Sequence, residues 1–420
     1  MVIGVIAEYN PFHNGHIYHL DKIKEKYPNS IIILVMSGNI TERGDISIIN
    51  KWDKAEIVLK YGIDLVVELP FKYASQSADM FAKGAIEILN ELKVEKIIFG
   101  SESDNIELLY KLANTQLSNE YNNLVKNYLD KYSYPDALGK ALKDLTNINI
   151  DTPNDLLGIS YIKEIIKNNY NICCETIKRT NDYNSKEISV ISSATSIREA
   201  INSNIDISNS VPKETLSKIN NNLVLDNYYD LIKYKILSTN DLTYILGIDE
   251  KIEPRIKKSI NVSNNIDELI HNIKTKKYSY NRIKRLLIYI LLDYKKIEHN
   301  TNNYIRILGL NKKGSKYLSS IKKNIKLPII TNYSNSNHLI DIDIRINDIL
   351  SIKTNMPNEI SEVIRKIDID WYLFYCTLIY IYNWPYICII NIFCFVYIIF
   401  TFIIYNHKWT DIHYPIITII

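Results

Sequence analysis

Two histidines and a glycine, His13, Gly15 and His16, follow a short apolar run near the start of the sequence. The run, residues 2–7, predicts a buried strand, and the apolar spacing of residues 17–23 predicts a helix. A turn between such elements faces the ligand crevice of a parallel sheet. Glycine lets a phosphate approach the backbone, and a helix start favours negative charge. The stretch therefore predicts a phosphate site in which the imidazoles stabilise developing charge.

A second stretch of similar chemical character lies at residues 193–198, with the sequence Ser-Ala-Thr-Ser-Ile-Arg. Hydroxyl groups and free N–H groups at a helix start, with an arginine one turn on, form a cradle for an anion. Taken alone, this is the start of an ordinary capped helix, and two loop histidines alone could be surface residues. Paired with the first stretch, it predicts a second anion-binding turn.

The elements that must position these residues alternate between strands and helices. Apolar, β-branched runs predict strands at about residues 2–7, 31–36, 64–68, 94–99 and 172–178. Helical spacing of apolar residues predicts helices between them, for example at residues 50–60 and 74–92. This alternation predicts an α/β fold with a doubly wound parallel sheet of the Rossmann-like type.

Two more turns at predicted strand ends are candidate ligand contacts. Arg43 lies in the polar loop 37–45, where it can meet a phosphate or a carboxylate. The alternative is a solvent-facing turn with a surface arginine. Gly100 ends the strand at residues 94–99 and permits close backbone approach to a nucleotide base or ribose.

The composition changes after about residue 203, where Asn-rich segments and amphipathic helices replace the strand rhythm. We therefore predict a catalytic domain over residues 1–203 and a mainly helical, basic domain over residues 204–370. Basic residues interleaved with tyrosines can meet phosphates and stack on bases, so the second domain is a candidate RNA-binding region. The alternative is a solvated, lysine-rich face. The candidate contacts are Lys276, Lys277, Arg282, Arg285, Lys312 and Lys313.

The final segment, residues 371–420, is anomalous because residues 371–406 carry no formal charge. Within it, residues 386–405 are almost wholly apolar and meet the length rule for a membrane-spanning helix. The sequence leaves open a membrane anchor, a buried segment and an out-of-frame end. We do not expect a membrane as a partner, but the apolar run 386–405 does not exclude one.

Charge and cysteine content set looser bounds. The net charge of +3 is too small to identify a partner by itself. The first residues enter a strand directly, with no signal-peptide pattern. The cysteines lack the spacing of a zinc site or a disulfide framework, so we expect a reduced, cytoplasmic location. They are Cys173, Cys174, Cys376, Cys388 and Cys394.

The His-x-Gly-His turn in this context resembles the signature of the nucleotidyltransferase and class I aminoacyl-tRNA synthetase superfamily. With the other motifs, residues 1 to about 200 closely resemble the bacterial tRNA(Met) cytidine acetate ligase family. The motifs lie at residues 7–16, 36–39, 51–52, 64–70, 73–78, 99–103, 153–158 and 193–198. A weaker resemblance continues at residues 282–287, 306–314 and 339–348. Lys54 stands where the family is expected to have arginine, and the apolar run 371–405 has no recognised counterpart.

The resemblance implies an ATP-dependent ligase reaction in two steps. Acetate attacks the α-phosphate of ATP, which gives acetyl-adenylate and pyrophosphate. The N4 amine of the wobble cytidine of elongator tRNA(Met) then takes the acetyl group, and AMP is released. His13 and His16 are implied as the catalytic residues, and Mg²⁺ is expected to bridge the triphosphate through unknown protein ligands. The implied ATP-binding residues are Ile6, Ala7, Glu8, Tyr9, Asn10, Pro11, Phe12, His13, Asn14, Gly15, His16, Ile17, Tyr18, His19, Gly100, Asn154, Arg179, Thr195, Ser196 and Arg198.

Two other functions stay open at this point. One is a metabolite adenylyltransferase of the same fold, which would not need the basic helical domain. The other is a non-catalytic protein, RNA-binding or tethered to a membrane, with a relic nucleotide site. The intact histidine and Ser/Thr–Arg motifs argue against a relic.

Overall fold

The computed structural model describes residues 1–179, 189–220, 223–357, 359–360, 362 and 364–367. The apolar run 386–405, with the rest of the predicted tail, lies outside these residues. In the described part of the chain, no helix has the length and apolar character needed to cross a membrane.

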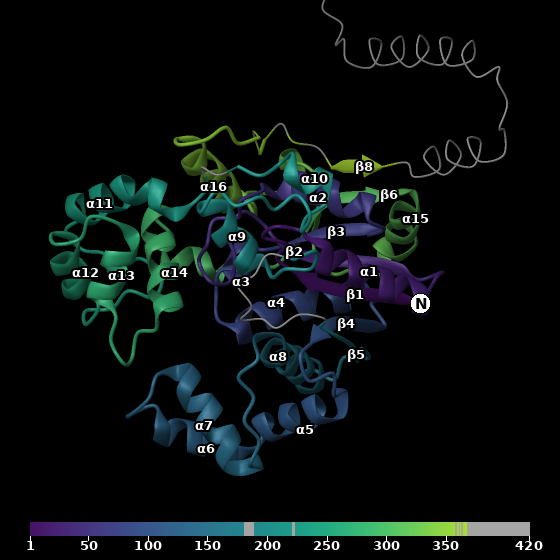
Figure 1. Cartoon of the computed structure of the whole chain (residues 1–420), viewed down its shortest axis with the longest axis horizontal. Helices are drawn as coiled ribbons and strands as arrows, with labels where there is room; N and C mark the ends of the chain where they lie inside the picture. The colour runs from purple at the N-terminus through teal and green to yellow at the C-terminus, as the bar shows by residue number, and fades with distance from the viewer. Residues whose placement is uncertain (180–188, 221–222, 358, 361, 363, 368–420) are drawn as a thin grey trace, which may run out of the picture. The chain divides into compact units, whose positions relative to one another are not determined.

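A mixed sheet of eight strands runs through the described residues (Figure 1). The strands are β1 Val2–Ala7, β2 Ile31–Ser37, β3 Leu65–Leu69, β4 Lys96–Ser101, β5 Cys173–Lys178, β6 Ile305–Asn311, β7 Ile329–Ile330 and β8 Arg365–Ile367. Their order is β5-β4-β1-β2-β3-β6-β7, and β8 pairs with β6. Strands β1 to β5 are parallel, which confirms the predicted α/β fold with a doubly wound parallel sheet.

Sixteen α-helices and four short 3₁₀ helices accompany the sheet in the part of the chain that the structure describes. The α-helices are α1 Asn14–Lys26, α2 Lys51–Lys60, α3 Phe71–Ala74, α4 Ala78–Glu91, α5 Ile106–Leu117, α6 Asn119–Tyr128, α7 Tyr134–Thr146, α8 Pro153–Lys167, α9 Ala194–Asn202, α10 Lys213–Leu216, α11 Tyr229–Ser238, α12 Glu253–Ile260, α13 Ile266–Ile273, α14 Tyr280–Leu291, α15 Lys312–Ile321 and α16 Asp341–Ser351. The 3₁₀ helices are Leu225–Tyr228, Lys296–Asn300, Lys322–Asn324 and Tyr333–Asn335.

The central strands are buried on both faces, as their unbroken apolar sequences require. In β2, Ile33 and Val35 belong to the core that includes residues of α4, α5 and α8. Their neighbours Ile32 and Leu34 belong to the opposite core, with residues of α1 and α2. Side chains alternate between the two faces with the period of a strand, so each helix layer covers one face of the sheet.

A third core lies among α11, α12, α13, α14 and α16. Figure 1 shows α11 to α14 grouped together, in teal and green. These helices lie in the part of the chain predicted to be mainly helical, but β6, β7 and β8 also come from it. Strand β6 pairs antiparallel with β3, and all seven of its residues are buried. A short buried run among helical patterns has no period that separates a strand from a helix, which is why these strands were not predicted.

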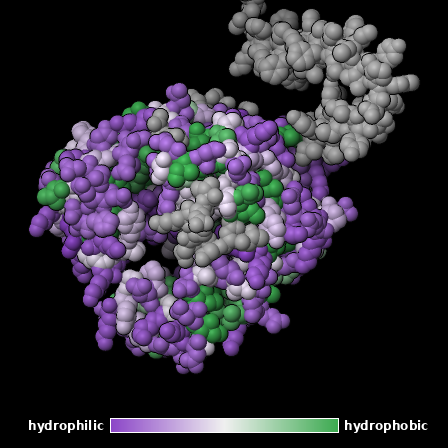
Figure 2. Space-filling model, in the orientation of Figure 1, coloured by the Kyte–Doolittle hydropathy of each residue, from purple (hydrophilic) through white to green (hydrophobic). Residues whose placement is uncertain are grey.

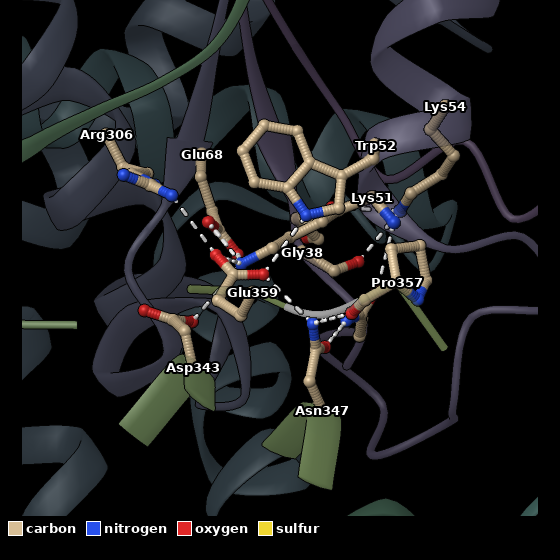
Figure 3. A network of polar contacts seen from close by, with 12 residues as sticks. Gly38, Lys51, Trp52, Lys54, Glu68, Arg306, Asp343, Asn347, Pro357 and Glu359 are labelled. Carbon is tan, nitrogen blue, oxygen red and sulfur yellow. Dashed lines mark hydrogen bonds and ion pairs between the residues drawn. The ribbon is translucent and has the colours of Figure 1, made fainter. Parts of the chain in front are cut away.

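A cluster of charged side chains joins the sheet to the last described segment (Figure 3). Lys51 of α2 lies 2.9 Å from Glu68 of β3 and 3.0 Å from Glu359. Asp343 of α16 lies 3.9 Å from Lys51, and Arg306 of β6 lies 3.3 Å from Glu359. Each side chain is at most 4% exposed. Burial, with the nearby carboxyl of Asp343, raises the pKa of Glu68 to about 8.

Candidate active site

A cavity of 530 Å³ lies at the carboxyl ends of β1, β4 and β5. This volume is in the usual range for a small-molecule site. Six helices, α1, α4, α7, α8, α9 and α14, each contribute residues of their first turn to the wall. These first-turn residues include Gly15, Ala78, Pro135, Pro153, Ala194 and Asn281. The free N–H groups and dipoles of helix N-termini favour an anionic ligand, so the cavity suits a polyphosphate.

The two histidines of the His-x-Gly-His turn have fixed tautomers. His13 is the N-cap of α1, and its Nδ1 accepts a hydrogen bond from Gly15 N at 3.1 Å. His16 Nδ1 accepts from His13 N at 3.2 Å, and the two rings stack with centroids 3.6 Å apart. Because each Nδ1 is an acceptor, each neutral ring carries its proton on Nε2. The pair therefore offers two N–H donors to a ligand in the cavity.

The surroundings of these rings keep them neutral. Burial, together with the positive charges of Arg179 and Arg198, lowers the pKa of His13 to about 3. Burial also lowers the pKa of His16 well below its usual value, with His13 and Arg179 adding to the effect. The pKa of His19, which also lines the cavity, is lowered to about 4 by burial and by Arg179. Neutral rings can donate to phosphate oxygens at physiological pH without losing a proton.

Glycine is needed at position 15 because His13 folds back over it. A Cβ built at Gly15 would lie 2.9 Å from Cε1 of the His13 ring. A side chain there would push the ring away from its bond with the helix start. The glycine of the motif therefore serves the placement of the histidine as well as phosphate approach.

The second predicted anion-binding turn lies directly beside the first. Ser193 is the N-cap of α9 and accepts from Ser196 N at 3.1 Å. Arg198 donates through Nη1 to the backbone oxygen of Asn10 at 2.6 Å and through Nη2 to Thr195 Oγ1 at 3.4 Å. The structure thus brings together two motifs that are far apart in the sequence.

A third group of predicted residues lies at the ends of β4, β5 and α8. Gly100, Asn154 and Arg179 all line the cavity. Asn154 Nδ2 donates to Glu102 Oε1 at 2.5 Å, and Arg179 Nε lies 3.7 Å from the same oxygen. Glu102 therefore orients one amide and one guanidinium group on this wall.

The structure brings most, but not all, of the predicted ATP-binding residues to the cavity wall. Those that line it are Ile6, Ala7, Glu8, Tyr9, Asn10, His13, Gly15, His16, Tyr18, His19, Gly100, Asn154, Arg179, Thr195 and Arg198. Those that do not are Pro11, Phe12, Asn14, Ile17 and Ser196.

The residues that miss the wall have other contacts. Phe12 is fully buried in the core shared with α1 and α2, and Ile17 packs against the same core. Asn14 Nδ2 donates to the backbone oxygens of Val190 and Asn209 at 2.8 and 2.9 Å. From these positions Phe12, Ile17 and Asn14 support the His-x-Gly-His turn.

Lys54 shows how the chain tolerates its departure from the expected arginine. Its Nζ donates to the backbone oxygens of Glu8, Ser37 and Gly38 at 3.0, 2.9 and 2.8 Å. An ammonium group has three donors and finds three acceptors here. Lysine therefore fixes the ends of β1 and β2 against each other with every donor paired.

Sequence reasoning missed several residues of the wall. Glu42 and Asp45 line the cavity beside the predicted Arg43, and so do Pro135 of α7 and Asn281 of α14. Pro135 and Asn281 each follow a serine at a helix start, Ser133 and Ser279. That signal marks helix starts throughout the chain, so it could not single out the two that reach the cavity.

The predicted tRNA contacts fall in two separate places. Lys276 and Lys277 are exposed just before α14, and the guanidinium of Arg282 lies 4.6 Å from the centre of the Tyr278 ring. Arg285 is half-buried and donates to Glu42.

Lys312 and Lys313 begin α15 at the other edge of the sheet. Lys313 contacts the backbone oxygen of Ser30 and lies 3.6 Å from Asp64, which precede β2 and β3. The amino ends of these strands lie opposite the edge with the cavity. The structure therefore does not bring the six basic residues onto one surface.

A parallel α/β sheet whose first strand ends in a His-x-Gly-His turn, with the predicted second anion-binding turn beside it, defines a nucleotidyltransferase-type protein. Residues 1–362 match the family described as HIGH Nucleotidyl Transferase. Among relatives, tRNA(Met) cytidine acetate ligase of Geobacillus sp. (strain WCH70) is 37% identical over 360 residues, 80% of this chain and 90% of the relative. The protein of that name from Mycoplasma mobile is 43% identical over 304 residues, 70% of this chain and 100% of the relative. The chain belongs to the tRNA(Met) cytidine acetate ligase family.

Solved structures agree with this assignment. The apo crystal structure of Thermotoga maritima TmcAL matches with a TM-score of 0.79 and 30% sequence identity. A second crystal form of that protein, bound with alpha-thio ATP, matches with a TM-score of 0.77. Each comparison covers 87% of this chain and 99% of the other.

Proposed function

We propose that this chain is an ATP-dependent ligase that acetylates the wobble cytidine of elongator tRNA(Met). Acetate attacks the α-phosphate of ATP to give acetyl-adenylate and pyrophosphate. The N4 amine of the cytidine then takes the acetyl group, and AMP leaves. The observation that carries this proposal is the meeting of both anion-binding turns in one cavity, in a chain of the tRNA(Met) cytidine acetate ligase family.

The histidine pair would stabilise charge during the first step. Nε2–H of His13 and His16 would donate to oxygens of the α-phosphate and of the leaving pyrophosphate, since each Nδ1 is already bonded to the backbone. Thr195 and Arg198 would hold the distal phosphates. Ser196 would support that turn through its backbone bond to Ser193.

The remaining wall would receive the adenosine. Gly100, Asn154 and Arg179 lie together at the end of β4, the start of α8 and the end of β5. Acetate supplies the attacking oxygen, so no protein nucleophile is required.

Magnesium would enter as part of a magnesium–ATP complex. It can bridge the phosphate oxygens and offset their charge. The described residues contain no group of three His, Cys, Asp or Glu side chains arranged to hold a metal ion. We name no protein ligand for the ion.

The tRNA would approach between α7 and α14. Pro135 and Asn281 line the cavity from these two helices, and Figure 2 shows a hollow in the surface between the α14 and α6–α7 regions. Lys276, Lys277 and Arg282 lie within five residues of Asn281 in the sequence and would contact phosphates beside the target base. An unstacked base, rather than a paired one, would enter such a cavity.

Pyrophosphate–ATP exchange on the purified full chain tests the first step. We expect exchange that depends on acetate, and a loss of roughly 10²- to 10³-fold in His16→Ala, because one donor to the developing charge is removed. Transfer of labelled acetate to tRNA(Met) tests the second step. If the wild-type protein showed no exchange with any short carboxylate, even with tRNA added, the ligase function would be contradicted.

A further inference from the structure

A short hairpin, residues 40–46, connects the cavity to the helical part of the chain. Ile40 and Ile46 pair as an antiparallel bridge, and Thr41 N donates to Asp45 O at 2.9 Å. Both isoleucines are buried in the core formed with α11 to α14. The tip, by contrast, lines the cavity with Thr41, Glu42, Arg43 and Asp45. The hairpin thus packs with one part of the molecule and presents its tip to another.

Helix α14 holds the tip through backbone and side-chain contacts. Arg285 Nη1 donates to the backbone oxygen of Glu42 at 3.1 Å and to its Oε1 at 3.2 Å. Lys284 forms an ion pair with Asp45. Gly44 has a φ of +78°, and a Cβ there would lie 2.8 Å from the backbone nitrogen of Arg285. Only a glycine allows the hairpin to approach the helix this closely.

The other side of the tip holds the end of β1. Glu42 N donates to Oε1 of Glu8 at 2.6 Å, and Ser37 Oγ donates to the same oxygen at 3.3 Å. Glu8 follows β1 directly and lines the cavity, five residues before His13. A continuous chain of contacts therefore runs from Arg285 through Glu42 to Glu8.

We propose that Arg285 is a positioning residue for the nucleotide cavity, acting through Glu42, rather than a contact for RNA. The proposal rests on the proposed function for its assay, and it revises the role that the sequence suggested for this arginine. Its side chain is 14% exposed and its guanidinium faces the hairpin. The first half-reaction, which needs no tRNA, should therefore depend on a residue of the helical part.

The test is Arg285→Ala in pyrophosphate–ATP exchange without tRNA. We expect kcat/KM for exchange to fall by roughly tenfold or more, mainly through KM, because the wall at Glu42 and Glu8 loses its support. Arg285→Lys should recover part of the loss, since an ammonium group can still reach the Glu42 oxygens. Glu42→Gln removes only the charge, since an amide oxygen accepts the same bond, so its loss should be smaller than that of Arg285→Ala.

The matched control is Arg255→Ala in α12, in the same helical part of the chain. Arg255 is exposed, donates to the backbone oxygen of Asn272 at 3.3 Å and has no contact with the hairpin among the described residues. Exchange should be unchanged in this variant. Equal thermal midpoints for the two alanine variants would show that the effect of Arg285 is local.

Calorimetric binding of ATP separates this proposal from the ligase function. ATP binding needs no acetate and no turnover, so it reports on the cavity even if wild-type exchange is absent. A Kd for ATP raised severalfold in Arg285→Ala supports the positioning role. An unchanged Kd, with exchange as in wild type and a loss only in transfer to tRNA, would overturn it and make Arg285 an RNA contact.

Discussion

Each histidine of the His-x-Gly-His turn uses one ring nitrogen to hold the backbone and leaves the other for a ligand. His13 Nδ1 bonds Gly15 N, and His16 Nδ1 bonds His13 N. This reciprocal capping fixes both tautomers before any substrate arrives. The donors are therefore preorganised, which is the condition for strong stabilisation of charge in a transition state.

At this scale we predict that His13 stays neutral from about pH 8 to about pH 5, because burial with Arg179 and Arg198 lowers its pKa to about 3. In ¹H–¹⁵N spectra of the imidazoles, Nε2 should remain protonated and Nδ1 unprotonated over this range. The spectrum of His13→Gln identifies its signals. A titration midpoint above about pH 6 would contradict this account.

At the scale of elements, close backbone packing joins segments that lie far apart in the sequence. Gly314, in the first turn of α15, faces the start of β3, and a Cβ there would lie 1.9 Å from the backbone oxygen of Asp64. Asn311 caps the same helix by accepting from Gly314 N and donating to the Asp64 carboxylate at 2.8 Å. Helix α15 thus begins where β3 begins.

We therefore expect Gly314→Ala to lower the free energy of unfolding by about 3 kcal/mol, since backbone atoms would have to move. Gly139→Ala is the matched control. In the part of the chain that the structure describes, no atom other than those of the adjacent residues and the helix's own backbone lies within 4 Å of a Cβ at Gly139 in α7. Alanine should therefore stabilise the helix by about 0.5–1 kcal/mol. Urea unfolding of both variants makes the comparison, and equal midpoints would refute the packing argument.

The strand and helix rhythm of the first half of the chain was predictable, because its periods are local and its turns carry marked residues such as Gly15. The β6 pairing was not, since nothing local in residues 305–311 names β3 as its neighbour. The contacts of the hairpin at residues 40–46 could not be predicted for the same reason. Arg285 was predicted as an RNA contact from its charge and its basic neighbours, whereas its partner Glu42 is remote in sequence. Lys276 is exposed and Arg285 is half-buried, and this difference can be seen only in the folded chain.

At the scale of the whole molecule, the buried charge cluster ties α2, β3, β6 and α16 to Glu359. The five groups comprise two cations and three carboxyl groups. Burial disfavours the Lys51 ammonium, but the surrounding carboxylates hold its pKa above its usual value. The loss of any one member would leave the other groups buried without a compensating charge, which would be strongly destabilising.

Lys51→Met tests this arrangement. We expect a loss of about 3–5 kcal/mol in the free energy of unfolding, because the cation that faces three carboxyl groups is removed. Without the cation, the pKa of Glu68 in the folded chain, already about 8, should rise further. The folded chain would then hold a proton that the unfolded chain has released, so the loss should grow as the pH rises above about 8. Lys60→Met, at the exposed end of the same helix, should change the stability by less than about 0.5 kcal/mol. A pH-independent difference between the two variants would contradict the prediction.

The antiparallel strand β6 and Glu359 also affect the fate of the chain during synthesis. Strands β1 to β3 leave the ribosome early, but β6 covers the edge of β3 only after more than two hundred further residues have been made. Glu359, which contacts Lys51 in the cluster that includes Glu68, is synthesised later still. A nascent or truncated chain that stops short of this point already carries both anion-binding turns, yet presents an uncovered strand edge. Quality control by chaperones and proteases would therefore act on chains that have both turns of the proposed phosphate site but not the complete sheet.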